Sequence, residues 1–182
     1  MRDELIERAR RGDRDAFGQL AAQDINRLHA IARLILRDVD LAEDAVQEAL
    51  IRCWRQLPNL RDVANFDGWL YRILVRAAAD ESSNRRRHKA TVASLRLEPS
   101  VADQSGSVAD RAVLDAGFRR LSIEHRAVVV LHHYADLPLT EVALALGIPS
   151  GTAKSRYHYA MASLRASLEA DARRTTVQGV SS

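Results

Sequence analysis

Apolar residues recur at three- and four-residue spacing along most of the chain, which is the pattern of amphipathic helices rather than strands. The first such segment follows Asp13, whose side chain can cap a helix N-terminus. The next is predicted to begin at Asp40, where Glu43 stands three residues later and completes a capping box. The inner faces of these two helices contain Phe17, Leu20, Ala21, Leu28, Ile31, Ala32 and Ile35, and then Leu41, Ala45, Val46, Ala49, Cys53, Trp54 and Leu57.

A third helix is predicted after a loop at Pro58–Asn65, and it runs from Phe66 into the basic triplet Arg85–Arg87. Its inner face contains Phe66, Trp69, Leu70, Ile73, Leu74, Ala77 and Ala78. Beyond this helix the periodicity fades, and Pro, Ser and Gly mix with scattered charges from His88 to Gly106. This change in composition predicts a flexible linker over residues 88–107.

Helical periodicity returns near Val108, and Ser122 can cap one of the helices that follow. The inward positions are Ala112, Val113, Ala116, Gly117 and Leu121, and then Ala127, Val128, Val130, Leu131 and Tyr134. The sequence therefore predicts an all-α protein of two small helical domains joined by a flexible linker. The predicted boundaries are 1–87 for the first domain, 88–107 for the linker, 108–170 for the second domain and 171–182 for a frayed tail.

The stretch from Leu139 to Leu168 has the pattern of two helices separated by a tight turn. Thr140 can cap the first helix and Ser150 the second. Gly147 stands between them, where a turn often needs positive φ. The second helix carries one apolar stripe, formed by Ala153, Tyr157, Ala160, Met161 and Leu164. These features predict a helix-turn-helix, although a helical hairpin that only packs has a similar pattern.

Polar side chains cover the opposite face of that second helix, with short hydrogen-bonding groups in the middle and cations at the sides. The middle of such a face suits base edges in the major groove, and the sides suit phosphates. The positive end of the helix adds attraction for phosphate. The candidate DNA-binding residues are Ser150, Thr152, Lys154, Ser155, Arg156, His158 and Tyr159.

Composition limits what else the protein can be. The chain has 182 residues, of which 47% are hydrophobic and 28% charged, so it has the make-up of a globular protein rather than a disordered one. The net charge of +3 is too small for a polybasic coat, so contact with nucleic acid depends on local clustering of cations. No apolar run approaches a membrane span, and no signal-peptide core is present. We expect a cytoplasmic protein without membrane insertion.

The sequence offers no pattern for catalysis, metal or cofactor binding. Cys53 is the single cysteine, so it can form no intrachain disulfide, and we expect it in the core. Four histidines (His125, His132, His133 and His158) are not joined by other ligands at the spacing of a metal site. No GxxxxGK loop or Ser/His/Asp grouping occurs. We therefore predict no metal, no cofactor and no enzymatic activity.

Three blocks stand in order along the chain: Asp40–Leu57, Phe66–Asp80 and the stretch from Leu121 to Arg165. Together they resemble bacterial sigma factors of the extracytoplasmic-function (ECF) type, the minimal two-domain class of the sigma-70 family. The block DLAEDAVQEALIRCWRQL (Asp40–Leu57) is similar to the family's polymerase-binding helix. The block FDGWLYRILVRAAAD (Phe66–Asp80) is similar to its promoter-melting helix. The stretch from Leu121 to Arg165 looks like its C-terminal domain. The resemblance implies a factor that binds core RNA polymerase and directs promoter-specific initiation of transcription.

The resemblance also implies partners and places them on the chain. It implies that the chain binds core polymerase, through the coiled coil of the largest subunit and through the flap. It also implies binding to promoter DNA and control by an anti-sigma factor. The coiled coil is expected on the outer face of the helix after Asp40, where an exposed isoleucine stands among charges. The implied polymerase-binding residues are Asp44, Gln47, Glu48, Ile51, Arg52 and Arg55. The family's linker passes through the polymerase near the RNA path.

The first domain is implied to open the −10 element and to hold a flipped-out base of the non-template strand. The implied −10 residues are Leu60, Arg61, Asn65, Phe66, Trp69, Arg72, Arg76, Arg85 and Arg86. The aromatic members of this set are also candidates for simple core positions. Arg76 departs from the family pattern, which often has Asn there, so the identity of the flipped base does not carry over.

The second domain is implied to read the −35 element with the polar face described above, and it departs from the family pattern at two positions. Ala153 stands where an aliphatic residue is common, and Tyr159 stands where Arg is common. Tyrosine can donate a hydrogen bond or pack on a thymine methyl, but it lacks the reach of a cation to guanine. Two other classes stay open: a helix-turn-helix regulator that acts without replacing the sigma subunit, and a helical adaptor that binds only proteins.

Overall fold

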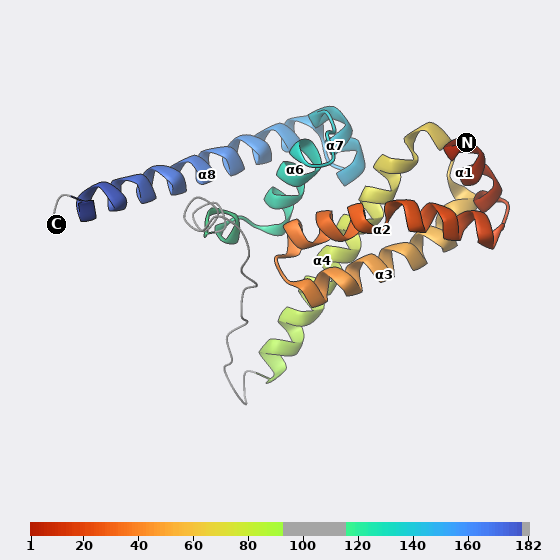
Figure 1. The fold of residues 1–182 in the computed structure, drawn as a ribbon, viewed down its shortest axis with the longest axis horizontal. Helices are drawn as coiled ribbons and strands as arrows, with labels where there is room; N and C mark the ends of the chain where they lie inside the picture. The colour runs from red at the N-terminus through yellow and green to blue at the C-terminus, as the bar shows by residue number, and fades with distance from the viewer. Residues whose placement is uncertain (93–115, 180–182) are drawn as a thin grey trace.

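The computed structural model describes residues 1–92 and 116–179, with side chains for residues 1–88 and 116–170. The described chain is helical throughout and contains no strand, which confirms the all-α prediction. Figure 1 shows the order of the elements. The first half contains α1 (Arg2–Arg10), α2 (Arg14–Leu36), α3 (Val39–Gln56), the short 3-10 turns η1 (Leu57–Asn59) and η2 (Val63–Asn65), and α4 (Phe66–Val92). The second half contains a helical segment at 116–120, α6 (Ile123–His133), α7 (Leu139–Leu146) and α8 (Ser150–Gly179).

Local capping explains where the first long helices begin. The Asp13 carboxylate accepts hydrogen bonds from the backbone N–H groups of Asp15 and Ala16, both at 3.0 Å, as the sequence predicted. The predicted start of α3 at Asp40 is wrong, because Asp38 has the extended backbone of an N-cap and accepts from the N–H of Leu41 at 3.1 Å. Glu43 consequently closes no capping box.

The first half is built on α2 and α3, which pack against each other, with α4 packing across both (Figure 1). Its interior consists of large aliphatic side chains that are almost fully excluded from solvent, among them Leu20, Leu28, Ile31, Ile35, Val46, Leu57 and Leu74. Trp54 and Phe17 close one end of this core, with ring centroids 5.0 Å apart. The faces of α2, α3 and α4 that pack together are those that the sequence predicted to face inward.

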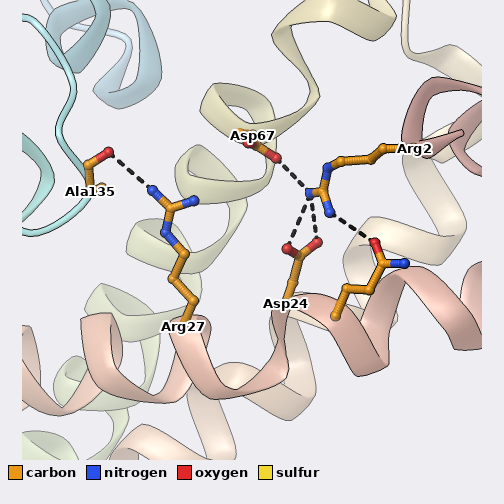
Figure 2. A network of polar contacts seen from close by, with 6 residues as sticks. Arg2, Asp24, Arg27, Asp67 and Ala135 are labelled. Atoms are coloured by element: carbon orange, nitrogen blue, oxygen red, sulfur yellow. Dashed lines mark hydrogen bonds and ion pairs between the residues drawn. The ribbon is translucent and has the colours of Figure 1, made fainter.

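A single arginine of α1 ties the first turn of α4 to α2 (Figure 2). Arg2 Nη2 lies 2.9 Å from Asp24 Oδ2 and 2.8 Å from Asp67 Oδ1. Its guanidinium carbon also lies 5.7 Å from the centroid of the Phe66 ring. The first turn of α4 is therefore anchored by a side chain 65 positions earlier in the chain.

The second half has the helix-turn-helix geometry that the sequence predicted, but not the predicted caps. Gly147 has φ +65° and ends α7 in the left-handed conformation. Pro138 occupies the N-cap position of α7 without a side-chain bond, so Thr140 does not cap it. The N–H groups of Thr152 and Ala153 both donate to the carbonyl of Pro149, so Ser150 is already helical.

Two helices are longer than the sequence predicted. Helix α4 continues to Val92 and takes the first five residues of the predicted 88–107 linker; the rest of that linker lies outside the described residues. Helix α8 continues to Gly179 rather than fraying from 171. Neither extension contains Pro or Gly before its last residue, so nothing in the local sequence breaks the helix. The predicted inward residues Ala112 and Val113 also lie outside the described residues.

Ser122 caps α6 as predicted, because its Oγ accepts from the N–H of His125. One predicted inward position of that helix is wrong. Tyr134 is 49% exposed, because it lies beyond the last residue of α6, His133.

The two halves share one apolar core rather than standing apart. The main cluster of buried side chains continues from α2 and α4 into α6 and α7, where Val128, Leu131, Ala135, Val142 and Ala145 join it. A smaller cluster, formed by Leu121, Val129, Ala160 and Leu164, holds α8 against α6. Within the described ranges, no helix is both long enough and apolar enough to cross a membrane.

We expect Gly147→Ala to destabilise the protein by about 1 kcal/mol, because an L-residue at this φ carries a left-handed backbone penalty. The added Cβ has room, since its nearest neighbour is an Arg76 nitrogen at 3.7 Å. Gly18→Ala is the matched control: Gly18 lies in α2 with open space around its Cβ and should gain about 0.5–1 kcal/mol. Urea unfolding midpoints measure both; a Gly147→Ala protein as stable as Gly18→Ala would contradict the backbone argument.

The Cys53 thiol should be unreactive in the folded protein. The residue is 1% exposed, and burial raises its pKa to about 12, so almost no thiolate exists near neutral pH. We expect labelling by a thiol reagent at pH 8 only when urea unfolds the chain. Rapid labelling without denaturant would show that α3 opens locally.

Candidate nucleic-acid and polymerase interfaces

The structure brings the seven candidate residues of the helix-turn-helix together on the first three turns of α8. The apolar stripe faces inward, with Ala153 and Ala160 fully buried. The polar side chains face away from it: Lys154, Ser155, His158 and Tyr159 are exposed, and Thr152 and Arg156 are half-buried. Ala153 therefore influences any DNA contact only through the packing of α8, whereas Tyr159 is 62% exposed.

Local contacts already engage some of this face. Ser155 Oγ donates to the carbonyl of Thr152 at 3.0 Å, which leaves its oxygen free to accept. Glu124 lies near Arg156, and its pKa is lowered, first by a hydrogen bond from Ser122 and to a lesser extent by the charge of Arg156. The carboxylate offsets part of the positive charge on that side, so Lys154 is the more available cation.

The predicted −10 residues divide into buried and exposed groups. Leu60 and Phe66 are 6% and 3% exposed and belong to the core. Trp69 is half-buried and packs against the same core, with its ring centroid 5.9 Å from that of Phe66. Arg61 and Asn65 are exposed in the segment before α4. The apolar members thus lie beneath this surface, and Arg61 and Asn65 lie on it.

Asn65 lies closely over the first turn of α4. A Cβ added at Gly68 would come within 2.6 Å of Asn65 Oδ1, so any larger residue at Gly68 would displace this side chain. The glycine therefore leaves room for the Asn65 amide in this position.

The arginines of α4 predicted to hold the melted strand face the C-terminal end of α7. Arg72 Nε donates to the carbonyl of Ala145 at 3.1 Å, and Arg72 Nη2 also donates to the carbonyl of Leu144. An Arg76 nitrogen comes near Gly147, which ends that helix. Carbonyls at a helix C-terminus lack intrahelical donors and carry partial negative charge, so guanidinium groups are favourable partners.

The basic triplet at the far end of α4 is partly engaged as well. Arg85 forms an ion pair with Asp38 at 3.0 Å, the residue that caps α3. Arg86 is exposed, and its Nε reaches only the carbonyl of Ser82, at 3.4 Å. Arg85 is therefore committed to the fold, and Arg86 is the more available of the two.

A second arginine that the sequence analysis did not single out joins the two halves (Figure 2). Arg27 on α2 donates to the carbonyl of Ala135, just beyond α6, at 3.0 Å. Its guanidinium also lies 5.3 Å from the ring centroid of buried Tyr71, a cation–π geometry. From the sequence, Arg27 could be recognised only as a polar residue on a helix. Its contact could not be predicted, because the partner lies 108 positions away in the chain.

The predicted polymerase-binding face on α3 is also divided. Asp44, Gln47 and Arg55 are exposed, and Ile51 is 39% exposed, large for an isoleucine. Arg52 instead donates to Glu48 and to Asp80, both at 2.7 Å, and these bonds, Asp80 first, raise the pKa of Arg52. The Glu48–Arg52–Asp80 chain fastens α3 to α4.

A groove of about 370 Å³ adjoins this face between α2 and α3. It is lined by Ile25, His29, Arg33, Glu43, Val46, Gln47 and Leu50. Gln47 belongs to both the groove and the predicted face, so the exposed surface of α3 continues onto α2.

Comparison with known proteins identifies both halves separately. Residues 20–88 match the family described as sigma-70 region 2, and residues 117–166 match sigma-70, region 4. The ECF RNA polymerase sigma factor SigM of Mycobacterium tuberculosis is 35% identical over 153 residues, which cover 84% of this chain and 77% of that protein. The RNA polymerase sigma-E factor of Streptomyces coelicolor is 34% identical over 143 residues, covering 79% of this chain and 80% of the other.

Two solved structures are similar over most of this chain. CnrH in complex with the cytosolic domain of CnrY has a TM-score of 0.66 at 26% identity, covering 93% of this chain and 97% of that one. The sigma factor RpoE of Bartonella quintana, in complex with the anti-sigma factor NepR, has a TM-score of 0.70 over 84% of this chain and 96% of its own. At 23% identity the second likeness concerns the fold alone.

We expect Arg27→Ala to loosen the packing of α6 on α2, because it removes the bond to Ala135 and the contact with Tyr71. Amide hydrogens at the C-terminal end of α6 should exchange about five- to twentyfold faster, in line with the loss of a charge-assisted hydrogen bond. Arg14→Ala, an exposed arginine of the same helix, is the control. Equal exchange in both variants would show that the shared apolar core alone holds the two halves.

Proposed function

The chain belongs to the sigma-70 family of RNA polymerase sigma factors, in its extracytoplasmic-function class, and we propose how its two halves divide the work of that family. A sigma factor is not an enzyme: it binds core RNA polymerase and promoter DNA and directs where transcription begins. In this chain, residues 1–87 serve core binding and opening of the −10 element, and residues 108–170 serve recognition of the −35 element. The linker joins them through the polymerase.

The observation that carries the −35 assignment is the position of α8. The left-handed turn at Gly147 and the buried stripe on α8 leave one polar helical face outward, with the N-terminal end of the helix exposed beside it. That face has the composition of a major-groove reading helix, with hydrogen-bonding groups in its middle and cations beside them. The proposed contacts are Ser150, Thr152, Lys154, Ser155, Arg156, His158 and Tyr159.

For the −10 element we propose that α4 and the loop before it bind the melted strand. Arg61 and Asn65 lie at the surface for contact with an unstacked base, while buried Leu60 and Phe66 support them from inside. Arg72 and Arg76 hold the strand backbone, and Arg86 extends that path. Because Arg72 is bonded to the end of α7, strand binding through its Nε and Nη2 requires Arg72 to release those carbonyls.

For core polymerase we propose the exposed part of α3 as the docking face. Asp44, Gln47, Ile51 and Arg55 contact the coiled coil of the largest subunit. Glu48 and Arg52 contribute by holding α3 against α4, since both are already paired. An exposed isoleucine among charged residues is typical of the centre of a specific protein contact.

We also infer control by an anti-sigma factor in the cytoplasm. A relative of this fold, CnrH, is described in complex with the cytosolic domain of CnrY, and its likeness covers 93% of this chain. Protein purified from its native cells should therefore carry a bound protein that blocks transcription when it is added back. Full activity of the freshly purified chain under all growth conditions would contradict this inference.

Promoter-specific transcription tests the main proposal. The chain is mixed with core polymerase and a promoter library, and the run-off transcripts are sequenced. We expect transcripts from a narrow set of promoters, and comigration of the chain with core polymerase. Failure of both would sink the proposal. A helix-turn-helix regulator that acts beside another sigma subunit is disfavoured, because the first half matches sigma-70 region 2.

Lys154→Ala should weaken binding to −35 DNA and reduce the slope of log affinity against log salt by about one, as loss of one phosphate contact predicts. Arg165→Ala is the matched control, because it removes an exposed cation from the same helix about 16 Å further along. Filter binding or fluorescence anisotropy at several salt concentrations gives both slopes. An unchanged slope in Lys154→Ala would argue against a phosphate contact there.

A further inference from the structure

Histidines of α6 contact the tyrosines of α8 at two places. His125 and His132 stand seven residues apart, two helical turns, so they share a face of α6. The His132 ring meets Tyr157 edge-on at 5.1 Å between centroids, and the His125 ring meets Tyr159 at 4.7 Å. The two contacts have the same kinds of residues but different surroundings.

The Tyr157 contact lies partly inside the protein and holds the helices together. The Tyr157 hydroxyl lies 3.2 Å from His133 Nε2, and its ring packs against the main core. His132 is itself anchored, with Nδ1 2.7 Å from the carbonyl of Leu137. Both the Tyr157 hydroxyl and His132 Nδ1 therefore already have polar partners within the protein.

The Tyr159 contact lies at the surface that we propose reads DNA. Tyr159 is 62% exposed, and among the described residues its hydroxyl has no hydrogen-bond partner. The His125 ring has a polar partner of its own. Its Nδ1 lies 2.8 Å from the Oγ of Ser122, which caps α6. The Tyr159 ring is thus packed against His125 on one side and exposed to solvent on the other.

We propose that His125 is a positioning residue for promoter recognition, which orients the Tyr159 ring so that it selects thymine at one position of the −35 element. This inference rests on the proposed −35 function of α8. An aromatic ring packs on the C5-methyl of thymine, and its hydroxyl donates to the O4 acceptor, but both contacts require one ring orientation. A long exposed side chain loses rotamer freedom on binding; a ring already packed against His125 loses less.

The size of the effect follows from that rotamer cost. Releasing Tyr159 from its support should reduce the selection of thymine by about two- to tenfold, as expected for one side chain that is no longer pre-oriented. Affinity for the phosphates, which depends on cations of the same helix, should hardly change. A merely structural role for His125 would instead lower binding to all promoters alike.

The test is a promoter library with the −35 element randomised, transcribed by the full chain with core polymerase. Base enrichment is a ratio within one sample, so partial loss of active protein does not alter it. We expect the wild-type chain to enrich thymine at one position and Tyr159→Ala to lose that enrichment there alone. His125→Ala should lose most of it at the same position, and His125→Phe, which keeps a flat ring, should retain it.

His132→Ala is the matched control, because it removes a histidine from the same face of α6 without touching Tyr159. It should leave thymine enrichment unchanged, even if it lowers stability. Unchanged enrichment in His125→Ala, a uniform loss at every position, or a loss in His125→Phe equal to that in His125→Ala would each overturn the proposal.

Failure of the underlying function would look different. If the wild-type chain enriched no base at any −35 position, the assignment of α8 to the −35 element would fail, and this inference with it. If the wild-type chain selected a −35 sequence but Tyr159→Ala changed no position, only the present inference would fall.

Discussion

The carbonyl groups at the C-terminal ends of α6 and α7 are the constraint on which the arrangement of this protein depends. The last carbonyls of a helix have no donor within the helix, so they accept from the following turn, from water or from side chains elsewhere. Arg27 supplies a donor to Ala135, and Arg72 supplies donors to Ala145 and Leu144. These side chains come from α2 and α4, so satisfying the second half's helix ends also joins it to the first half.

One of the two arginines that join the halves, Arg72, is also a proposed contact of the melted DNA strand. The Nε and Nη2 donors that Arg72 gives to the end of α7 are not available to the backbone of melted DNA at the same time. In the proposed function, the same surface of α4 serves two partners, one intramolecular and one the promoter. The apolar core shared by the two halves also favours the arrangement in which they are packed together. If the halves separate on the promoter, the free energy of binding polymerase and DNA must exceed the free energy lost by separating them.

Much of the fold was predictable because it depends on local chemistry. The Asp13 and Ser122 caps and the Gly147 turn were recognisable from neighbouring residues alone. The misplaced caps show the limit of such signals. Asp38 and Asp40 are both acceptable cap residues, and only the backbone conformation after Arg37, which turns with φ +59°, selects the first. Likewise, fading periodicity after the arginine triplet was interpreted as a linker, although nothing there ends α4 before Val92.

The candidate surfaces follow the same division. By itself the sequence determined which residues face outward on α8, because a 3.6-residue period separates Lys154 and Tyr159 from the buried stripe whatever the helix packs against. Only the tertiary structure decided which of those side chains are available and which are held. Arg72 meets α7 across 73 positions of chain, Arg52 is paired with Asp80, and Tyr159 is supported by His125. Contacts between distant residues leave no periodic signal, because they depend on how whole helices pack rather than on any local pattern.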